Sequence, residues 1–141
     1  MGFKAEPGIS FGTPCGGNLV ARFWYRGFGV STSGFYLPAG LTSIASGNGL
    51  EAAALYRIGR PAQQGLAPYF GIAAGAAEVA IRSRRLFKAD YYFGPQVGAY
   101  YAGFFAQLGL GIGRFHLTDS GSPLVAFPLF QIGYCYNGTL P

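Results

Sequence analysis

The chain has 141 residues, enough for a single domain, and only 11% of them are charged, against about 25% in soluble domains. So few charges could not cover the surface of a soluble domain, and with 24 glycines and 17% aromatic residues the composition indicates that lipid surrounds the folded chain. The net charge of +5 does not indicate nucleic-acid binding, because the basic residues are scattered or confined to one short cluster without a nucleic-acid motif.

The first half of the chain contains segments in which apolar residues alternate with small or polar ones, as in β-strands. A tight turn at Arg26-Gly27 separates the second segment from the third, and a Gly/Ser/Pro-rich loop at Pro38–Asn48 precedes the fourth. In the fourth segment the charged residues Glu51 and Arg57 share one parity, which we expect to face the interior. The four segments are Lys4–Thr13, Asn18–Tyr25, Phe28–Ser33 and Leu50–Ile58, and Phe35–Leu37 lead from the third segment into the loop.

The second half of the chain continues the alternation, and a turn at Ala102-Gly103 joins two of its segments into a hairpin. The stretch Glu78–Lys88 is the most charged part of the chain and is predicted to be a protruding loop. A short loop at Thr118–Ser122 precedes the last segment. The four segments are Leu66–Ala77, Phe93–Tyr101, Phe104–Gly113 and Leu124–Tyr136.

The run Tyr91–His116 also has the length and apolar character of a transmembrane helix. Its repeated glycines and Pro95 weaken a helix, and a helix has no reason to segregate residues by parity. Each half of the run carries enough alternating residues for a tilted strand to cross the hydrocarbon of a bilayer. We therefore favour two transmembrane strands over one helix.

An even number of such strands, with an apolar outside and a small or polar inside, is the pattern of a closed barrel without an unpaired edge in lipid. The sequence therefore predicts an all-β fold, an eight-stranded antiparallel up-and-down transmembrane β-barrel that forms one domain over residues 1–141. Aromatic residues are predicted to form a girdle at each end. One girdle contains Trp24, Tyr25, Phe28, Tyr100, Tyr101, Phe104, Phe105, Tyr134 and Tyr136, and the other contains Phe35, Tyr36, Tyr91, Tyr92 and Phe93.

Tight turns at one end and longer loops at the other are typical of bacterial outer-membrane barrels, with the tight turns on the periplasmic side. In this pattern the whole chain resembles the small eight-stranded family that includes outer membrane protein A, its X relative and the opacity proteins. The alternating aromatic end Phe130–Tyr136 resembles the segment that such proteins present to the barrel-assembly machinery, although this chain continues to Pro141. The first ten residues lack the apolar core of a signal peptide, so we expect the mature form of an exported protein.

Polar residues on the inner parity are expected to pair with one another and close the lumen. The inner wall of the fifth to seventh strands is small, with Gly71, Ala73, Gly75, Gly94, Gly98, Gly109, Gly111 and Gly113, so a pocket for one small ligand is the alternative. The predicted polar network contains Glu6, Arg22, Glu51, Arg57, Gln96 and Gln107, together with Lys4, Trp24, Tyr69, Tyr100 and Gln131.

The stretch Arg114–Gly121 is similar to the one that carries the catalytic histidine and serine in the lipid A deacylase barrels. The resemblance would make His116 the base, but Thr118 stands where the serine would be. The last strand, which supplies the orienting acid in those enzymes, contains no Asp or Glu here. His116 and Thr118 are therefore weak catalytic candidates, and a place in the polar rim is the alternative for both.

The basic cluster of the charged stretch would lie just outside the membrane, where lipopolysaccharide carries its phosphates. It consists of Arg82, Arg84, Arg85 and Lys88, which are candidates for contact with lipid headgroups. Cys15 and Cys135 are expected near opposite membrane faces, too far apart for a disulfide. No cofactor and no metal site are expected.

These patterns predict an integral protein of the bacterial outer membrane with a non-enzymatic structural, adhesive or partner-binding role. A barrel that modifies lipid A, or that binds lipid or a small ligand, is the competing hypothesis. The expected partners are outer-membrane lipids and lipopolysaccharide, and the barrel-assembly machinery during biogenesis. The short loops weaken the adhesive role and leave open an accessory subunit of a larger membrane complex.

Overall fold

The computed structural model describes residues 3–13, 16–37, 45–58, 65–81, 84–116 and 124–136. Of residues 37, 45, 84–87 and 116 it describes the backbone only. Within these ranges no helix is both long enough and apolar enough to span a membrane.

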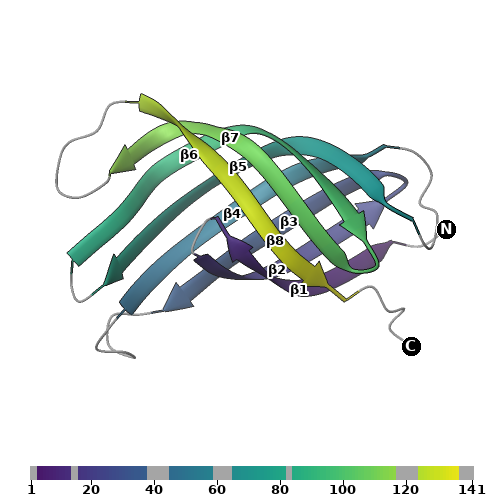
Figure 1. Cartoon of the computed structure of the whole chain (residues 1–141), viewed down its shortest axis with the longest axis horizontal. Coiled ribbons are helices and arrows are strands. Elements are labelled where there is room, and N and C mark those ends of the chain that lie inside the picture. The colour runs from purple at the N-terminus through teal and green to yellow at the C-terminus, as the bar shows by residue number, and fades with distance from the viewer. Residues whose placement is uncertain are drawn as a thin grey trace.

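The described residues form eight antiparallel strands, each hydrogen-bonded to the next in sequence, and the last pairs with the first (Figure 1). The predicted all-β fold with up-and-down strands in a closed barrel is thereby confirmed. The strands are β1 (Lys4–Gly12), β2 (Gly16–Tyr25), β3 (Phe28–Leu37), β4 (Ala45–Arg57), β5 (Ala67–Ile81), β6 (Arg84–Tyr101), β7 (Phe104–His116) and β8 (Leu124–Cys135).

Two hairpin turns have the backbone conformation that a two-residue connection between antiparallel strands requires. Arg26 and Gly27 join β2 to β3 with φ values of 48° and 90°, and Ala102 and Gly103 join β6 to β7 with 49° and 93°. Two successive positive φ angles match the right-handed twist of the flanking strands. Glycine adopts the second angle without strain, which explains its place in both turns.

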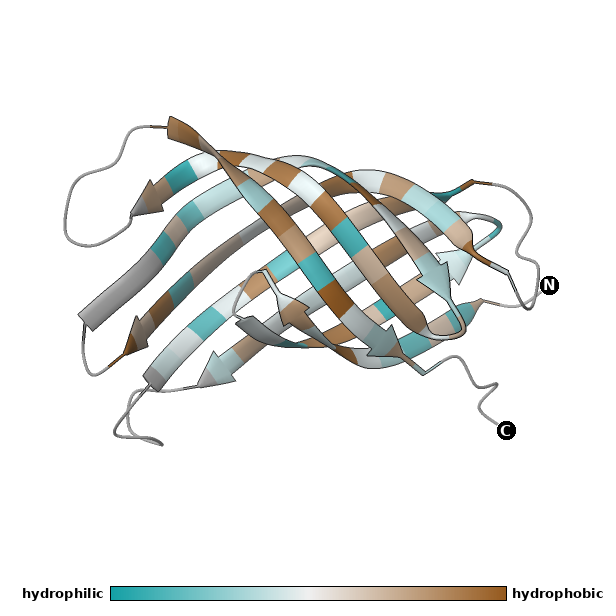
Figure 2. Ribbon diagram, viewed as in Figure 1, coloured by the Kyte–Doolittle hydropathy of each residue, from teal (hydrophilic) through white to brown (hydrophobic). Residues whose placement is uncertain are grey.

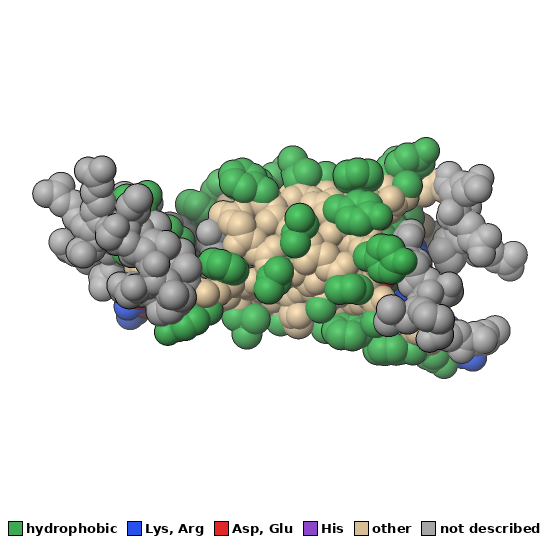
Figure 3. All heavy atoms as spheres, turned by 90° about the horizontal axis from the view of Figure 1, so that it is seen from below, with side chains coloured by type: hydrophobic (Ala, Val, Ile, Leu, Met, Phe, Trp, Pro, Cys, Tyr) green, Lys and Arg blue, Asp and Glu red, His purple; other side chains and the backbone are tan. Residues whose placement is uncertain are grey.

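Side chains alternate between the two faces of the barrel wall, as the sequence predicts. Along β7, for example, Phe104 and Leu108 are exposed, whereas Phe105 and Gln107 are buried. Figure 2 shows the same alternation of hydropathy along the strands. The outer face carries many apolar side chains, and in Figure 3 charged side chains are visible only toward the two ends. The barrel thus has an apolar outside and a more polar inside.

The seam between β1 and β8 is the shortest ladder of the ring. It runs from the pair Gly8 and Cys135 to the pair Gly12 and Gln131. Two further backbone bonds extend it, from Tyr136 N to Pro7 O at 2.7 Å and from Thr13 N to Phe130 O at 2.8 Å. The ladder between β5 and β6 is much longer and reaches from Ala67 to Ile81 on β5. One side of the barrel is therefore taller than the other.

The prediction of a loop at Glu78–Lys88 is wrong for its described part. Strand β5 continues to Ile81, β6 begins at Arg84, and Glu78 pairs with Lys88 across the hairpin. Register shifts occur in this ladder and between Ala89 and Tyr91 on β6. On β6 the inward position changes from the even residue Tyr92 to the odd residue Ala89, and such a change of parity hides a strand from a search for strict alternation. Strand β4 likewise begins at Ala45, earlier than predicted.

Several inward glycines lie directly opposite an aromatic residue whose ring covers them. A Cβ atom added to Gly98 would lie 2.5 Å from Tyr69 Cζ, and one added to Gly75 would lie 2.6 Å from the Tyr92 hydroxyl. Tyr69 pairs with Gly98, and Tyr92 with Gly75, in the β5–β6 ladder. The sequence analysis allowed a pocket beside the wall of small residues. The Tyr69 and Tyr92 rings occupy part of that space.

We expect Gly98→Ala to destabilise the barrel, because the added methyl group would occupy the place of the Tyr69 ring. Overpacking of this kind costs about 1–3 kcal/mol. Gly17→Ala is the matched control, since nothing lies within 4 Å of a Cβ there. Urea unfolding in detergent micelles should show a loss for Gly98→Ala alone, and equal stabilities would contradict the packing role of the glycine.

Candidate functional site

The structure brings the predicted polar residues together inside the barrel. Each lies on the inward face of its strand, and all are buried except Arg57, which is half-buried near the tight turns. The group consists of Glu6, Arg22, Glu51, Arg57, Gln96 and Gln107. Tyr69, Tyr100, Trp24 and Gln131 are buried with them, and Lys4 is half-buried at the same end as Arg57.

Arg22 is the centre of this interior and is fully buried, with 0% of its surface exposed. From β2 it reaches across the lumen, where its Nη2 donates to Gln107 Oε1 on β7 at 2.8 Å and to the Tyr69 hydroxyl on β5 at 3.1 Å. The Tyr69 hydroxyl also donates to Gln107 Oε1 at 2.8 Å. The guanidinium lies face-on to the Phe105 ring, with its Cζ 3.7 Å from the ring centroid. Arg22 thus links three walls of the barrel.

A second group lies between Arg22 and the tight turns. Trp24 Nε1 donates to Glu6 Oε2 at 3.2 Å, and Lys4 Nζ forms an ion pair with Glu6 Oε1 at 3.0 Å. The Arg57 guanidinium stacks on Trp24 from β4, with its Cζ 4.2 Å from the ring centroid. The Glu6 carboxylate is therefore held by Lys4 and Trp24.

A third group lies toward the loop end and is organised by Glu51. The Tyr92 hydroxyl donates to Glu51 Oε2 at 2.5 Å, and Gln131 Nε2 lies 3.5 Å from Glu51 Oε1. Gln131 Nε2 also donates to Ser33 Oγ at 2.8 Å. These bonds join β3, β4, β6 and β8 above the Arg22 group. Buried polar groups bound in this way tie opposite walls together and fill the lumen.

The sequence analysis did not identify Tyr92 and Phe105 as interior residues. It assigned both to the aromatic girdles alone, but their rings are buried inside, as are those of Trp24 and Tyr100, which it had also predicted on the inward face. Aromatic residues suit the interface and the interior alike, so residue type alone does not distinguish the two locations. The parity of Phe105, which it shares with Gln107, would have identified it.

At the loop end, charged residues occupy the outward face. Lys88 Nζ lies 3.4 Å from Asp90 Oδ1, and Arg114 on β7 is exposed. The sequence analysis did not include Arg114 among the residues expected to contact lipid headgroups. Arg114 follows Ile112 by two residues, so the alternation along the strand already placed its side chain on the outer face. Arg84 and Arg85 belong to β6, but their side chains lie outside the description, as does all of Arg82.

The weak catalytic candidates lie at the limit of the described residues. The backbone of His116 ends β7 opposite Lys88, its side chain is not described, and Thr118 falls outside the described ranges. Among the described residues no three His, Cys, Asp or Glu side chains gather as a metal site would require. Cys135 is a free, buried thiol on the inward face, and Cys15 lies outside the description.

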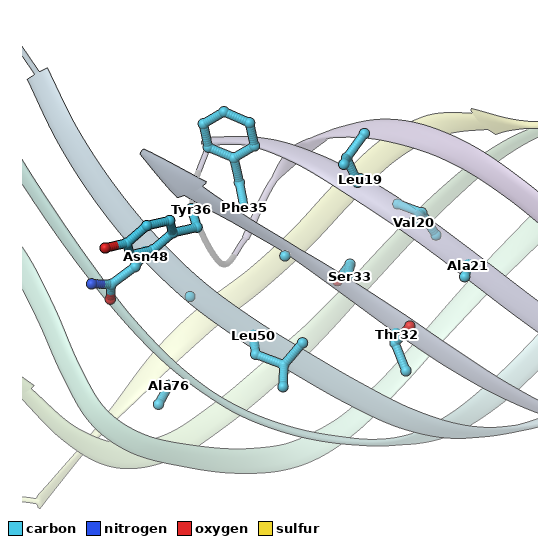
Figure 4. Close-up of a pocket in the computed structure, with 12 residues that line it drawn as sticks. Leu19, Val20, Ala21, Thr32, Ser33, Phe35, Tyr36, Asn48, Leu50 and Ala76 are labelled. Atoms are coloured by element: carbon cyan, nitrogen blue, oxygen red, sulfur yellow. The ribbon is translucent and has the colours of Figure 1, made fainter. Parts of the chain in front are cut away.

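A shallow groove crosses the outer face of the barrel at β2–β5 toward the loop end (Figure 4). It has a volume of about 850 Å³. Small residues on β3 lie between larger ones on β2 and β4, and this difference in size makes the groove. Its outward-facing lining includes Leu19, Ala21, Thr32, Gly34, Leu50 and Ala76.

Comparisons of this chain with protein-family models, with curated proteins and with solved structures found no match. The closed eight-stranded ring and its two-faced wall are therefore the observations on which a function is argued.

We expect Tyr92→Phe to destabilise the folded barrel, because it removes the donor nearest to the buried Glu51 carboxylate. Loss of a hydrogen bond to a buried charged group costs about 1–3 kcal/mol. Tyr91→Phe is the matched control, since Tyr91 is exposed on the outer face. Equilibrium unfolding of both variants measures the difference, and an equal effect would show that the hydroxyl of Tyr92 contributes nothing.

Proposed function

We propose that this chain is an integral β-barrel of a bacterial outer membrane with a closed polar lumen and a non-enzymatic role. The supporting observation is the contrast between the two faces of a closed ring. Large apolar residues are exposed all around the barrel, and Arg22, Glu6 and Glu51 are buried inside it. A soluble barrel has its apolar residues inside, so the observed contrast suits a lipid environment.

The height of the apolar surface supports the same proposal. On β7 the outward residues are apolar from Phe104 to Ile112, and the next one is Arg114. At about 3.3 Å per residue and a strand tilt of roughly 40°, this run covers about 20 Å along the barrel axis, near the apolar band of about 25 Å in outer-membrane barrels.

Aromatic residues cluster on the outer face near the tight turns, where an interface girdle would lie. Phe28 packs on Tyr56 with ring centroids 5.0 Å apart, and Phe104 packs on Tyr134 at the same separation. At the opposite end the outward face carries Lys88 and Arg114. We infer that the tight turns face the periplasm and that the charged end faces the lipopolysaccharide leaflet, whose phosphates would contact these cations.

The family that fits these features is the small eight-stranded outer-membrane group of protein A, its X relative and the opacity proteins. In this proposal the role is structural or partner-binding, and the partners are outer-membrane lipids, lipopolysaccharide and, during biogenesis, the barrel-assembly machinery. An accessory position in a larger membrane complex is supported by the groove at β2–β5. Small residues such as Gly34 and Ala76 allow another transmembrane segment to approach closely.

Expression in a Gram-negative host behind a signal peptide tests the location. We expect the protein in the outer-membrane fraction, with a mobility on denaturing gels that changes on heating, as closed barrels resist detergent until heated. Lipid A from the same cells should keep its mass if the role is non-enzymatic. A soluble or inner-membrane protein would overturn the location, and a lipid A change abolished by His116→Ala would overturn the non-enzymatic role.

We expect Leu108→Arg to weaken folding into lipid vesicles, because Leu108 lies midway along the apolar run of β7 and is 61% exposed. An arginine near the bilayer midplane costs about 2–4 kcal/mol, and one near the interface costs about 0–1 kcal/mol. Tyr36→Arg, at the loop end of β3, is the matched control. Equal unfolding free energies in vesicles would mean that Leu108 does not face hydrocarbon.

A further inference from the structure

The interior charges of the barrel do not cancel. In the described part of the chain, Lys4, Arg22 and Arg57 lie on the inward face against two carboxylates, Glu6 and Glu51, and the Lys4 side chain is 43% exposed at the rim. Glu6 binds Lys4 and Trp24, and Glu51 binds Tyr92 and Gln131. Each carboxylate also attracts one guanidinium through space, Glu6 that of Arg57 and Glu51 that of Arg22, so two carboxylates serve three cations. The hydrogen-bond partners of the fully buried Arg22 are the neutral Tyr69 and Gln107. A guanidinium cannot release its proton inside a protein, so this buried charge persists.

Among the described residues, unpaired hydrogen-bond donors outnumber unpaired acceptors in this interior, where Gln131 Oε1 and the Tyr100 hydroxyl are the oxygens without a partner and Glu6 Oε1 has only the ion pair with Lys4. Nε and Nη1 of Arg22 are buried and find no acceptor within the protein, and the same is true of Nε and Nη2 of Arg57. Gln96 Nε2 is a further buried donor without an acceptor. Leaving donors of a charged group unpaired is costly, and each such group calls for an explanation.

Both guanidiniums lie against one pair of aromatic rings. The Cζ of Arg57 is 4.2 Å from the Trp24 ring centroid, and that of Arg22 is 5.1 Å from the Tyr69 centroid. Trp24 and Tyr69 in turn contact each other edge to face, with centroids 6.2 Å apart. The two cations are therefore linked through one aromatic pair, and Arg22 also lies over the Phe105 ring at 3.7 Å.

We propose that this part of the lumen binds a small monovalent anion, of the size of a halide, between Arg22 and Arg57. Such an ion accepts hydrogen bonds from the unpaired N–H groups and supplies the negative charge that the interior lacks. Water would satisfy donors but would not neutralise Arg22. The proposal rests on the closed lumen of the proposed function, but not on a location in the outer membrane.

The ion would enter from the turn end. Of the described residues at this end, Lys4 and Arg57 are half-buried cations, and Arg22 lies deeper, so positive charge continues inward from the rim. A cleft lined by one sign of charge concentrates ions of the opposite sign. The carboxylate of Glu6 lies beside this route, but its pairing with Lys4 reduces its repulsion of an anion.

Trp24 is the one tryptophan of the chain and provides the readout, since it lies against Arg57. Iodide quenches indole fluorescence on contact. The protein, refolded in uncharged detergent micelles, is titrated with iodide at constant ionic strength, with a bulky organic anion as the balance. We expect saturable quenching that chloride reverses. Quenching that is linear, insensitive to chloride and no stronger than that by neutral acrylamide would overturn the proposal and leave water as the occupant.

Arg22→Gln removes the buried charge and should weaken iodide binding by about tenfold or more, because charge-assisted hydrogen bonds are lost. Arg26→Gln is the matched control, since Arg26 lies in the exposed turn between β2 and β3 and stacks on Tyr25. Equal affinities in these two variants would overturn the assignment to Arg22.

Gln107→Glu is a second test of anion binding, which applies if Arg22→Gln does not fold. It places a carboxylate at the Oε1 position that already accepts from Arg22, so the protein itself would supply the missing charge. We expect this variant to fold and to lose saturable iodide quenching, and retained binding would contradict the proposal. Heat-dependent gel mobility is recorded on every sample, so failure to form a barrel is distinguished from failure to bind an anion.

Discussion

Side chains alternate along each strand between the inside and the outside of the barrel. Because the ring is closed, every strand must keep the same assignment of residues to the two sides. In an open sheet an edge strand pairs on one side only and could slip by one residue without disturbing a second ladder. In the ring each strand pairs on both sides, so a slip in β2 would turn Arg22 outward and Leu19 inward. The inward charges and the outward apolar residues therefore specify the same register.

The interior meets two demands, for polar partners and for dense packing. Aromatic rings lie over glycines on the neighbouring strand, as Trp24 does over Gly29 and Phe105 over Gly133. The glycines allow rings that no larger residue would accommodate, and the rings carry the groups that bind the buried charges. Tyr69, for example, covers Gly98 and binds Arg22 through its hydroxyl. The same glycine–aromatic pairs thus fill the lumen and bind its buried charges.

Much of the fold follows from the sequence, because parity and turn residues are local signals. The inward placement of Glu51 and Gln107 and the turn at Arg26-Gly27 were predicted in this way. Contacts across the lumen were not, since Arg22 and Gln107 are separated by 85 residues and no local pattern relates them. The β5–β6 hairpin was mistaken for a loop because register shifts interrupt its alternation. The catalytic role of His116 stays a prediction.

Burying Arg22 costs free energy, but the buried charge also specifies the register of the strands. A buried ionic group replaced by apolar residues of similar volume often leaves a protein equally stable or more stable, so stability alone does not explain its presence. An interior of apolar residues would leave the inner and outer faces chemically alike, and a strand inserted in the wrong register would meet little penalty. In the membrane location proposed above, the wrong register would expose the Arg22 guanidinium to hydrocarbon, which costs several kcal/mol. The same charge that specifies the register then requires a counter-charge inside. The carboxylates Glu6 and Glu51 supply it only in part, because both are bound by other groups, and the proposed anion would supply the rest.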